Sequence, residues 1–229
     1  MKNLCIIPAR GGSKRIPRKN IKPFMGKPIM AYSIEAALNS GLFDEVMVST
    51  DDEEIAEVAK HYGASVPFFR STETANDYAT TVDVLLEVIE TYKQQGKTFD
   101  TICCLYSTAP FVTAERLKEA CLKLSDDIDG CFTMVEYSYP IQRSLIINKE
   151  GIVEMKYPEY HTSRTQDLEK IYHDAGQFYF VKTKILIEER TAWCKRAAPL
   201  VLSELEVQDL DTLTDWKLAE MKYELINKK

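Results

Sequence analysis

Short, fully apolar runs alternate along this chain with segments that carry apolar residues at helical spacing. A run such as LCIIP at 4–8 is typical of a strand buried on both faces. The spacing of Val82, Leu85 and Ile89 is that of an amphipathic helix. On this basis strands are predicted at 4–8, 45–50, 65–69, 101–106, 130–135, 178–182 and 198–202. Helices are predicted from Pro28 to Gly41, from Asp51 or Asp52 to about Tyr62, and at 78–92, 113–124 and 213–226.

The alternation of strands and helices predicts an α/β fold, with a mainly parallel sheet and helices on both faces. At 229 residues, the chain has the length of a single domain. The pattern changes after Val135, where Tyr, Pro and polar residues become frequent and only short alternating pieces remain. We interpret residues 136–178 as an inserted β-rich arm that serves as a flap or in dimerisation.

The chain is acidic overall, but its cations are concentrated at one end. The formal net charge is −6, which argues against a general nucleic-acid coat. Residues 1–34 nevertheless carry eight Lys or Arg and no Asp or Glu. We expect this segment to bind an anionic ligand, and the alternative is a solvated basic face.

Two further features bear on where the protein works. No apolar run approaches the roughly eighteen residues that span a bilayer, and the run at 4–9 is too short for a signal peptide. The six cysteines show no CxxC spacing, so reduced and inert thiols are expected. These observations predict a cytoplasmic protein that has neither a membrane nor a nucleic acid as its partner.

A turn-rich loop at 10–22 follows the first predicted strand, where α/β sheets bind ligands. Gly11 and Gly12 would let backbone amides approach phosphate oxygens closely. Arg10, Lys14 and Lys19 would supply positive charge for a triphosphate. The loop lacks the GxxxxGK[ST] and GxGxxG patterns, so the sequence indicates neither a P-loop ATPase nor a dinucleotide enzyme.

A pair of aspartates lies near the other end of the chain. Asp209 and Asp211 are two residues apart, which in an extended chain places both carboxylates on one face. Two hard oxygen ligands suit Mg²⁺ or Mn²⁺, the expected cofactor, together with phosphate oxygens. The alternative is that the pair only caps the helix that follows.

Five segments match a known family in order: PARGGSKRIPRKNIKPFMGKPIMAYSI at 8–34, VSTDDEEIA at 48–56, RSTETANDYATT at 70–81, LYSTAPF at 105–111 and VQDLDTLTDW at 207–216. The chain resembles the acylneuraminate cytidylyltransferases, which make CMP-activated nonulosonic acids. This resemblance covers almost the whole chain. It implies a Rossmann-like nucleotidyltransferase fold, a homodimer, dependence on a divalent cation, and CTP and a nonulosonic acid as substrates.

The resemblance also implies roles for individual residues. The implied nucleotide-binding residues are Ala9, Arg10, Gly11, Gly12, Ser13, Lys14, Asn20, Arg70, Asp77, Thr80 and Thr81. The implied catalytic residues are Arg10, Lys14, Lys19 and Asp211, and the implied metal ligands are Asp209 and Asp211. Without the resemblance, Arg70 would be a surface arginine, Asp77 a helix N-cap, and Thr80 and Thr81 helix-start residues.

The segment 164–179 matches the family's sugar-binding region. Arg164 suits the sugar carboxylate, because a guanidinium pairs with it bidentately. The other implied sugar-binding residues are Gln166, Tyr172, His173, Asp174, Gln177 and Tyr179. The alternative for Tyr179 is a core position, and that for His173 is an ordinary loop position.

The string YHDAGQFY resembles the pseudaminic acid branch of the family. The expected reaction is therefore transfer of CMP from CTP to pseudaminic acid with release of pyrophosphate. N-acetylneuraminic and legionaminic acid are the alternative acceptors, and a non-catalytic nucleotide-binding regulator is the alternative of another class. Tyr106 stands where sialic-acid members carry glutamine, which leaves open how cytosine is recognised.

Overall fold

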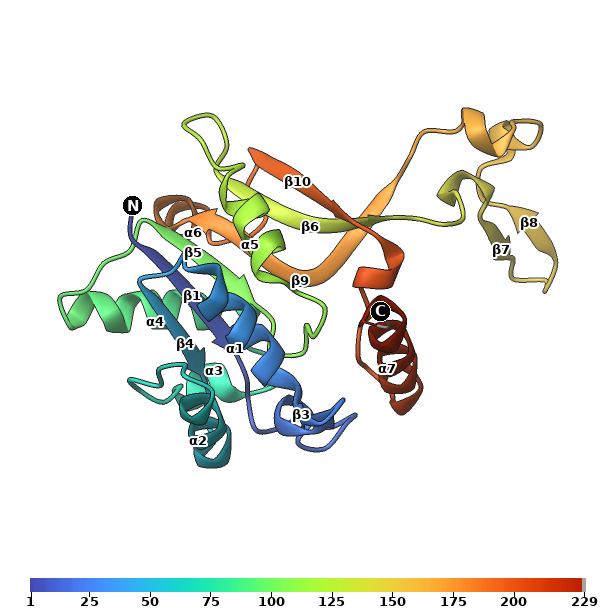
Figure 1. Ribbon diagram of the computed structural model, residues 1–229. Coiled ribbons are helices and arrows are strands. Elements are labelled where there is room, and N and C mark those ends of the chain that lie inside the picture. The colour runs from blue at the N-terminus through green and yellow to red at the C-terminus, as the bar shows by residue number, and fades with distance from the viewer. Residues whose placement is uncertain (228–229) are drawn as a thin grey trace.

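The computed structural model describes residues 1–227, and its centre is a six-stranded sheet (Figure 1). The strand order is β10-β6-β9-β5-β1-β4. These strands are β1 (Asn3–Pro8), β4 (Glu45–Ser49), β5 (Thr101–Leu105), β6 (Gly130–Glu136), β9 (Tyr172–Lys182) and β10 (Ala197–Leu202). Strand β9 runs antiparallel to both of its neighbours, and the remaining pairs are parallel. The predicted mainly parallel sheet is confirmed.

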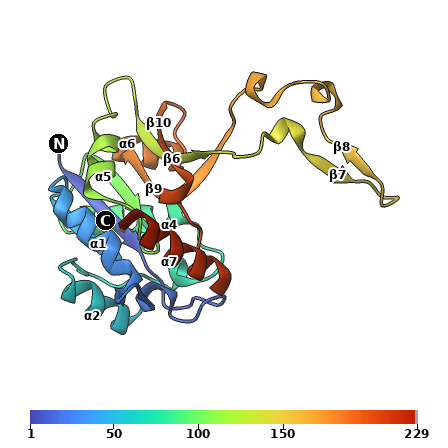
Figure 2. The same cartoon turned by 45° about the vertical axis from the view of Figure 1, so that its right-hand side comes forward.

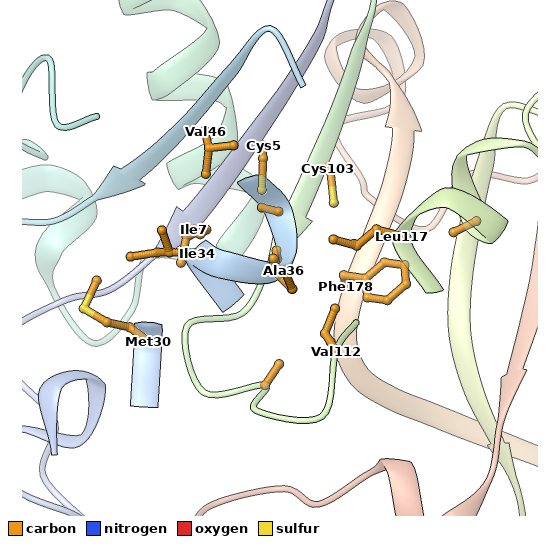
Figure 3. Close-up of a cluster of buried hydrophobic side chains, with 14 of the residues drawn as sticks. Cys5, Ile7, Met30, Ile34, Ala36, Val46, Cys103, Val112, Leu117 and Phe178 are labelled. Atoms are coloured by element: carbon orange, nitrogen blue, oxygen red, sulfur yellow. The ribbon is translucent and has the colours of Figure 1, made fainter. Parts of the chain in front are cut away.

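Helices cover both faces of this sheet. The α-helices of the described chain are α1 (Ile29–Ser40), α2 (Glu53–His61), α3 (Thr72–Ala75), α4 (Thr81–Gln94), α5 (Ala114–Cys121), α6 (Thr183–Glu189) and α7 (Leu213–Asn227). On one face α1 and α5 pack onto buried strand residues such as Cys5, Cys103 and Phe178 (Figure 3), and α2 contributes to the same cluster. On the other face, α4 and α6 contribute Leu85 and Leu186 to a second core. The α/β class is therefore confirmed.

A third apolar cluster joins the two ends of the chain. Phe24, on the short strand β2 (Pro23–Phe24) that pairs with β3 (Lys27–Pro28), is buried in this cluster. The Phe24 ring packs edge-on against the Trp216 ring of α7, with 5.6 Å between the ring centroids. Ile16 and Leu210 are buried in the same cluster. Because Leu210 lies between Asp209 and Asp211, this packing brings the aspartate pair to the N-terminal loop.

An arm leaves the body between β6 and β9 (Figures 1 and 2). It carries the antiparallel pair β7 (Leu145–Ile147) and β8 (Val153–Met155). The arm ends before Tyr172 and not at the predicted residue 178, because β9 pairs with β6 from Tyr172 onward, where Tyr172 lies opposite Glu136. The strand predicted at 178–182 is thus longer at its start.

Some boundaries follow from local capping. Helix α4 begins at Thr81 rather than at 78, because Thr80 and Asp83 form a reciprocal capping box. The strand predicted at 65–69 is absent from the described chain apart from a single bridge between Ser65 and Met47. Within residues 1–227, no helix combines the length and apolar character needed to cross a bilayer.

Candidate active site

A cavity of about 490 Å³ opens where β1 and β5 end. Its walls come from the loop after β1, from the segment that leads into α4, and from the residues after β5. The predicted site residues that line it are Arg10, Ser13, Lys14, Lys19, Asn20, Arg70, Asp77, Thr80 and Thr81. Arg15 also lines it, so the cavity presents five cationic side chains and one carboxylate among the described residues. Such a surface suits a polyanion.

Arg70 is a partly buried wall of this cavity. Its Nε donates to Ser49 Oγ at 3.1 Å, and its Nη2 donates to the Ser49 carbonyl at 2.7 Å. Burial lowers the pKa of Arg70, and the nearby carboxylates oppose this shift. The alternative of a surface arginine is therefore wrong, because the guanidinium is fixed against the end of β4.

Arg10 and Lys14 share one carboxylate. Arg10 Nη1 donates to Asp77 Oδ1 at 2.7 Å and to the Asn76 carbonyl at 3.1 Å. Lys14 forms an ion pair with the other oxygen of Asp77. The hydrogen bonds from Lys14 and Arg10 lower the pKa of Asp77. Asp77 is not the N-cap of α4, a position that Thr80 takes, and it neutralises two cations predicted to bind phosphate.

Lys19 and Asn20 lie on a short 3₁₀ turn, Lys19–Ile21, at the end of the loop. Lys19 Nζ donates to the Leu210 carbonyl at 2.8 Å, and burial lowers the pKa of Lys19. Asn20 Nδ2 donates to the Arg10 carbonyl at 2.8 Å, and its Oδ1 accepts from Ser107 Oγ at 2.8 Å. The Asn20 side chain therefore holds the loop in place through both its nitrogen and its oxygen. Its role in nucleotide binding stays a prediction.

Three predicted nucleotide-binding residues lie outside the cavity lining. Ala9 is buried, and its amide donates to the Ser49 carbonyl at 2.9 Å. The amide of Gly11 donates to Asp51 Oδ1 at 2.9 Å, so the expected contact of this amide with phosphate is not formed in this arrangement. Gly12 has open space where a Cβ would lie. The absence of a side chain at Gly11 is required here, because the Asp52 carboxylate occupies the space where a Cβ would lie.

The aspartate pair lies beside the cationic loop. Asp211 forms an ion pair with Arg15. Asp209 lines a second cavity of about 340 Å³, which shares Tyr106 and Thr108 with the first. The capping alternative for the pair is wrong, because Thr212 and Asp215 make the reciprocal hydrogen bonds at the start of α7.

The donor set at these aspartates fits a hard divalent cation. Asp209 is exposed and Asp211 is half-buried, so both carboxylates are accessible from solvent. Within residues 1–227, no three His, Cys, Asp or Glu side chains cluster as a complete metal cage. Mg²⁺ often binds through one or two carboxylates, with substrate phosphates and water as the other ligands. The pair therefore fits that mode of binding.

The predicted sugar-binding residues are divided between the body and the arm. Asp174 and Tyr179 line the second cavity, and the Tyr179 hydroxyl donates to the Asp174 carboxylate. Tyr179 is also buried, so it is a core residue and a wall residue at once. Burial followed by the Asp174 hydrogen bond raises the pKa of Tyr179. Gln177 is buried, while Tyr172 and His173 are exposed on the first residues of β9.

Arg164 and Gln166 lie on the arm, between β8 and β9, and neither lines either of the two cavities. Arg164 forms an ion pair with Asp167 at 2.7 Å, three residues further along. The segment 164–179 is therefore divided within this chain, because residues 164–171 belong to the arm, whereas β9 returns to the sheet.

Tyr106 joins the two cavities. Its hydroxyl lies 3.2 Å from Thr81 Oγ1, and its ring meets the edge of the Tyr179 ring at 5.9 Å. Burial raises the pKa of Tyr106. The two cavities thus meet at a neutral phenol between the start of α4 and the Asp174–Tyr179 pair.

The sequence profile of the cytidylyltransferase family matches residues 4–210. This chain belongs to the cytidylyltransferase family. Over 226 residues it is 48% identical to the pseudaminic acid cytidylyltransferase of Campylobacter jejuni subsp. jejuni serotype O:2, a match that covers 98% of this chain and 97% of that protein. It is 34% identical over 232 residues to the CMP-N,N'-diacetyllegionaminic acid synthase of Legionella pneumophila, with 98% and 97% covered.

A solved structure supports the same fold for this cytidylyltransferase. The CTP complex of CMP:2-keto-3-deoxy-manno-octonic acid synthetase superposes with a TM-score of 0.70 at 18% identity, and the match covers 100% of both chains. The expected nucleotidyltransferase fold is confirmed.

Sequence reasoning missed several residues at the site of this cytidylyltransferase. Arg15 was counted only as part of the basic loop, although it lines the cavity and pairs with Asp211. Asp51 and Asp52 were considered only as possible helix caps. Asp52 does cap α2, accepting from the Ile55 amide at 3.0 Å. Asp51 and Asp52 also accept hydrogen bonds from the loop at 10–22. The sequence signal for these contacts was the position of two acidic residues just after β4, the strand that pairs with β1.

Proposed function

We propose that this protein transfers CMP from CTP to pseudaminic acid and releases pyrophosphate. The observation that carries the proposal is the cavity in which five cationic side chains face the end of β1, with Asp209 and Asp211 beside it. The acceptor is proposed from the relatives, since identity is 48% to a pseudaminic acid cytidylyltransferase and 34% to a legionaminic acid enzyme.

In the proposed reaction a sugar hydroxyl attacks the α-phosphorus of CTP in line, and the bond to the β-phosphate breaks. Arg10, Lys14 and Lys19 would hold the phosphates that leave. The protein would need little covalent chemistry, because positioning and charge stabilisation supply most of the rate enhancement in such transfers. A pure nucleotide sensor would bind without needing carboxylates beside the phosphates, so the aspartate pair favours the enzyme over the regulator.

Asp209 and Asp211 are the residues that would hold Mg²⁺ or Mn²⁺. When bound, the ion would add positive charge at phosphate oxygens and favour ionisation of the attacking hydroxyl. Asp211 pairs with Arg15 in the protein alone, so Arg15 would have to release this carboxylate.

The base and the sugar are proposed to occupy different parts of the joined cavities. Arg70, Thr80 and Thr81 would lie on the nucleotide side. Asp174 and Tyr179 would lie on the sugar side, where the Asp174 carboxylate can accept hydrogen bonds from hydroxyl or amide groups.

A homodimer is part of the proposal. The arm exposes Leu145, Ile147, Ile152 and Val153, each more than half exposed. Exposed apolar side chains grouped on a projecting element favour burial against a partner. Arg164 and Gln166 would then contact a sugar only where the arm of one copy meets the body of another.

A cytoplasmic location is proposed as well. All six cysteines lie in the described range and are free thiols. Free thiols are typical of a reducing compartment.

The proposal is tested by pyrophosphate release from CTP with Mg²⁺ and each of three acceptors. Pseudaminic acid is expected to give the highest kcat/KM, and legionaminic and N-acetylneuraminic acid much lower values. Release with N-acetylneuraminic acid alone would refute the proposed acceptor. CTP binding without release from any acceptor would favour the regulator.

A further inference from the structure

The adjacent carboxylates of Asp51 and Asp52 bind the cationic loop, residues 10–22, on the side away from the two cavities. Asp51 Oδ1 accepts from the Gly11 amide at 2.9 Å, at the start of the loop. Asp52 binds Arg18 at the end of the loop with both oxygens, at 2.5 Å from Nη1 and 2.9 Å from Nη2. Asp51 and Asp52 are absent from the residues that line either cavity, within the part of the chain described. We call these contacts the loop clamp.

The loop clamp is anchored on regular structure. Asp51 and Asp52 follow β4, which pairs in parallel with β1 up to Pro8 opposite Ser49. Asp52 is also the N-cap of α2 and accepts from the Ile55 amide at 3.0 Å. The carboxylate is therefore fixed to the sheet edge and to a helix before it contacts the loop.

Asp52 contacts both ends of the loop. A Cβ on Gly11 would lie 2.7 Å from Asp52 Oδ2, so the carboxylate packs directly against the backbone next to Arg10. The same Asp52 oxygen accepts from Arg18. The Asp52 side chain therefore contacts Gly11, which follows Arg10, and Arg18, which precedes Lys19.

Arg18 shows why the loop needs this support. Its φ is 55° and its ψ is 30°, a left-handed conformation that is unfavourable for a residue with a side chain. The 3₁₀ turn that begins at Lys19 depends on this bend, since the amides of Ile21 and Lys22 both donate to the Arg18 carbonyl at 3.0 Å. Asp52 and Glu54 both bind the Arg18 guanidinium and hold it there.

We propose that Asp52, assisted by Asp51, is a positioning residue for nucleotide binding that sets the distance between Arg10 and Lys19. This proposal rests on the proposed function. A triphosphate would meet cations that are already arranged, so binding would not have to order the loop. The hydrogen bonds from Arg18 hold the pKa of Asp52 at about 2, so the clamp stays charged at neutral pH.

The first test is Asp52→Asn, with CTP and CMP binding measured by calorimetry. Asparagine caps helices as well as aspartate does, so α2 should be retained while the bidentate ion pair is lost. The Kd for CTP is expected to rise about tenfold, the scale of one charge-assisted hydrogen bond. The Kd for CMP should change by less than about twofold, since CMP lacks the β- and γ-phosphates that would span the loop.

Glu53→Gln is the matched control. Glu53 is an exposed residue in the first turn of α2, and its loss changes the net charge by the same amount. CTP binding by this variant should equal that of the wild type. Arg18→Ala tests the same contact without altering the α2 cap and should reproduce the Asp52→Asn result.

The double variant Asp52→Asn with Arg18→Ala tests whether the two residues affect CTP affinity through their shared contact or independently. If the two residues act through one contact, the double variant loses no more CTP affinity than either single variant. Additive losses, wild-type CTP affinity in Asp52→Asn, or equal losses for CTP and CMP would each overturn the proposal. Wild-type protein that binds CTP but releases no pyrophosphate would instead refute the proposed function and leave this comparison valid.

Discussion

Lys14→Ala is the sharpest single test of how the cavity binds a triphosphate. Lys14 lines the cavity, and its side chain is 78% exposed. It is held by an ion pair with Asp77, on a loop whose other end carries Lys19. In the proposed complex its ammonium would bind the β- or γ-phosphate, and the variant removes that charge.

The expected loss follows from the exposure of Lys14. A hydrogen bond between charged groups contributes about 1.5–3 kcal/mol, and solvent at a side chain this exposed reduces the contribution toward about 1 kcal/mol. A loss of about 1 kcal/mol corresponds to roughly a fivefold rise in the Kd for CTP. CMP should be affected less than about twofold, because it lacks the two outer phosphates.

The assay is calorimetric titration with CTP and with CMP at fixed ionic strength. Lys60→Ala is the control, because Lys60 is an exposed cation on α2 outside the cavity and its removal changes net charge equally. Equal losses for CTP and CMP would refute a role at the outer phosphates. A similar loss in Lys60→Ala would show that only the overall charge matters.

Four further expected outcomes concern Asp77, Asp211, Asp215 and Asp52. Asp77→Asn should strengthen pyrophosphate binding in a titration, because the Asp77 carboxylate neutralises Arg10 and Lys14. Weaker pyrophosphate binding by the variant would contradict this neutralising role. Asp211→Ala should lower turnover by on the order of 10²–10³ in pyrophosphate release with an unchanged Tm. Asp215→Ala should instead lower the free energy of unfolding, because Asp215 completes the reciprocal hydrogen bonds at the start of α7, and the reverse pattern would contradict both assignments. Asp52 has its pKa lowered to about 2 in the folded protein, so its stabilising contribution is present above pH 4 and is lost as pH falls toward 2. The difference in free energy of unfolding between wild type and Asp52→Asn, measured by urea unfolding, should therefore shrink as the pH falls from 4 to 2. A difference that stays constant would contradict the assignment of this stabilisation to the Asp52 carboxylate.

The order of strands and helices could be predicted because burial on both faces leaves uninterrupted apolar runs. The run at 4–8 and the run at 101–106 became β1 and β5, which pair side by side. The start of β9 could not be predicted in this way, because residues 172–176 are polar or small and owe their strand conformation to pairing with β6. Tertiary hydrogen bonding decided that boundary.

The site was predictable where one short segment supplies the chemistry. Arg10, Lys14 and Lys19 all come from one loop, and the structure places all three around one cavity. Contacts between distant segments were not predictable from spacing, such as that between Asp52 and Arg18. The arm that carries Arg164 was predicted from the change of composition after Val135, but its limit at Tyr172 was not, because pairing of β9 with β6 sets it.

The most direct test of the central claim is a crystal structure with CTP bound in the presence of Mg²⁺. The account predicts that the triphosphate lies in the cavity after β1, with its outer phosphates at Arg10, Lys14 and Lys19 and its α-phosphate toward Asp209 and Asp211. CTP bound elsewhere, or bound with its phosphates turned away from these cations, would contradict it.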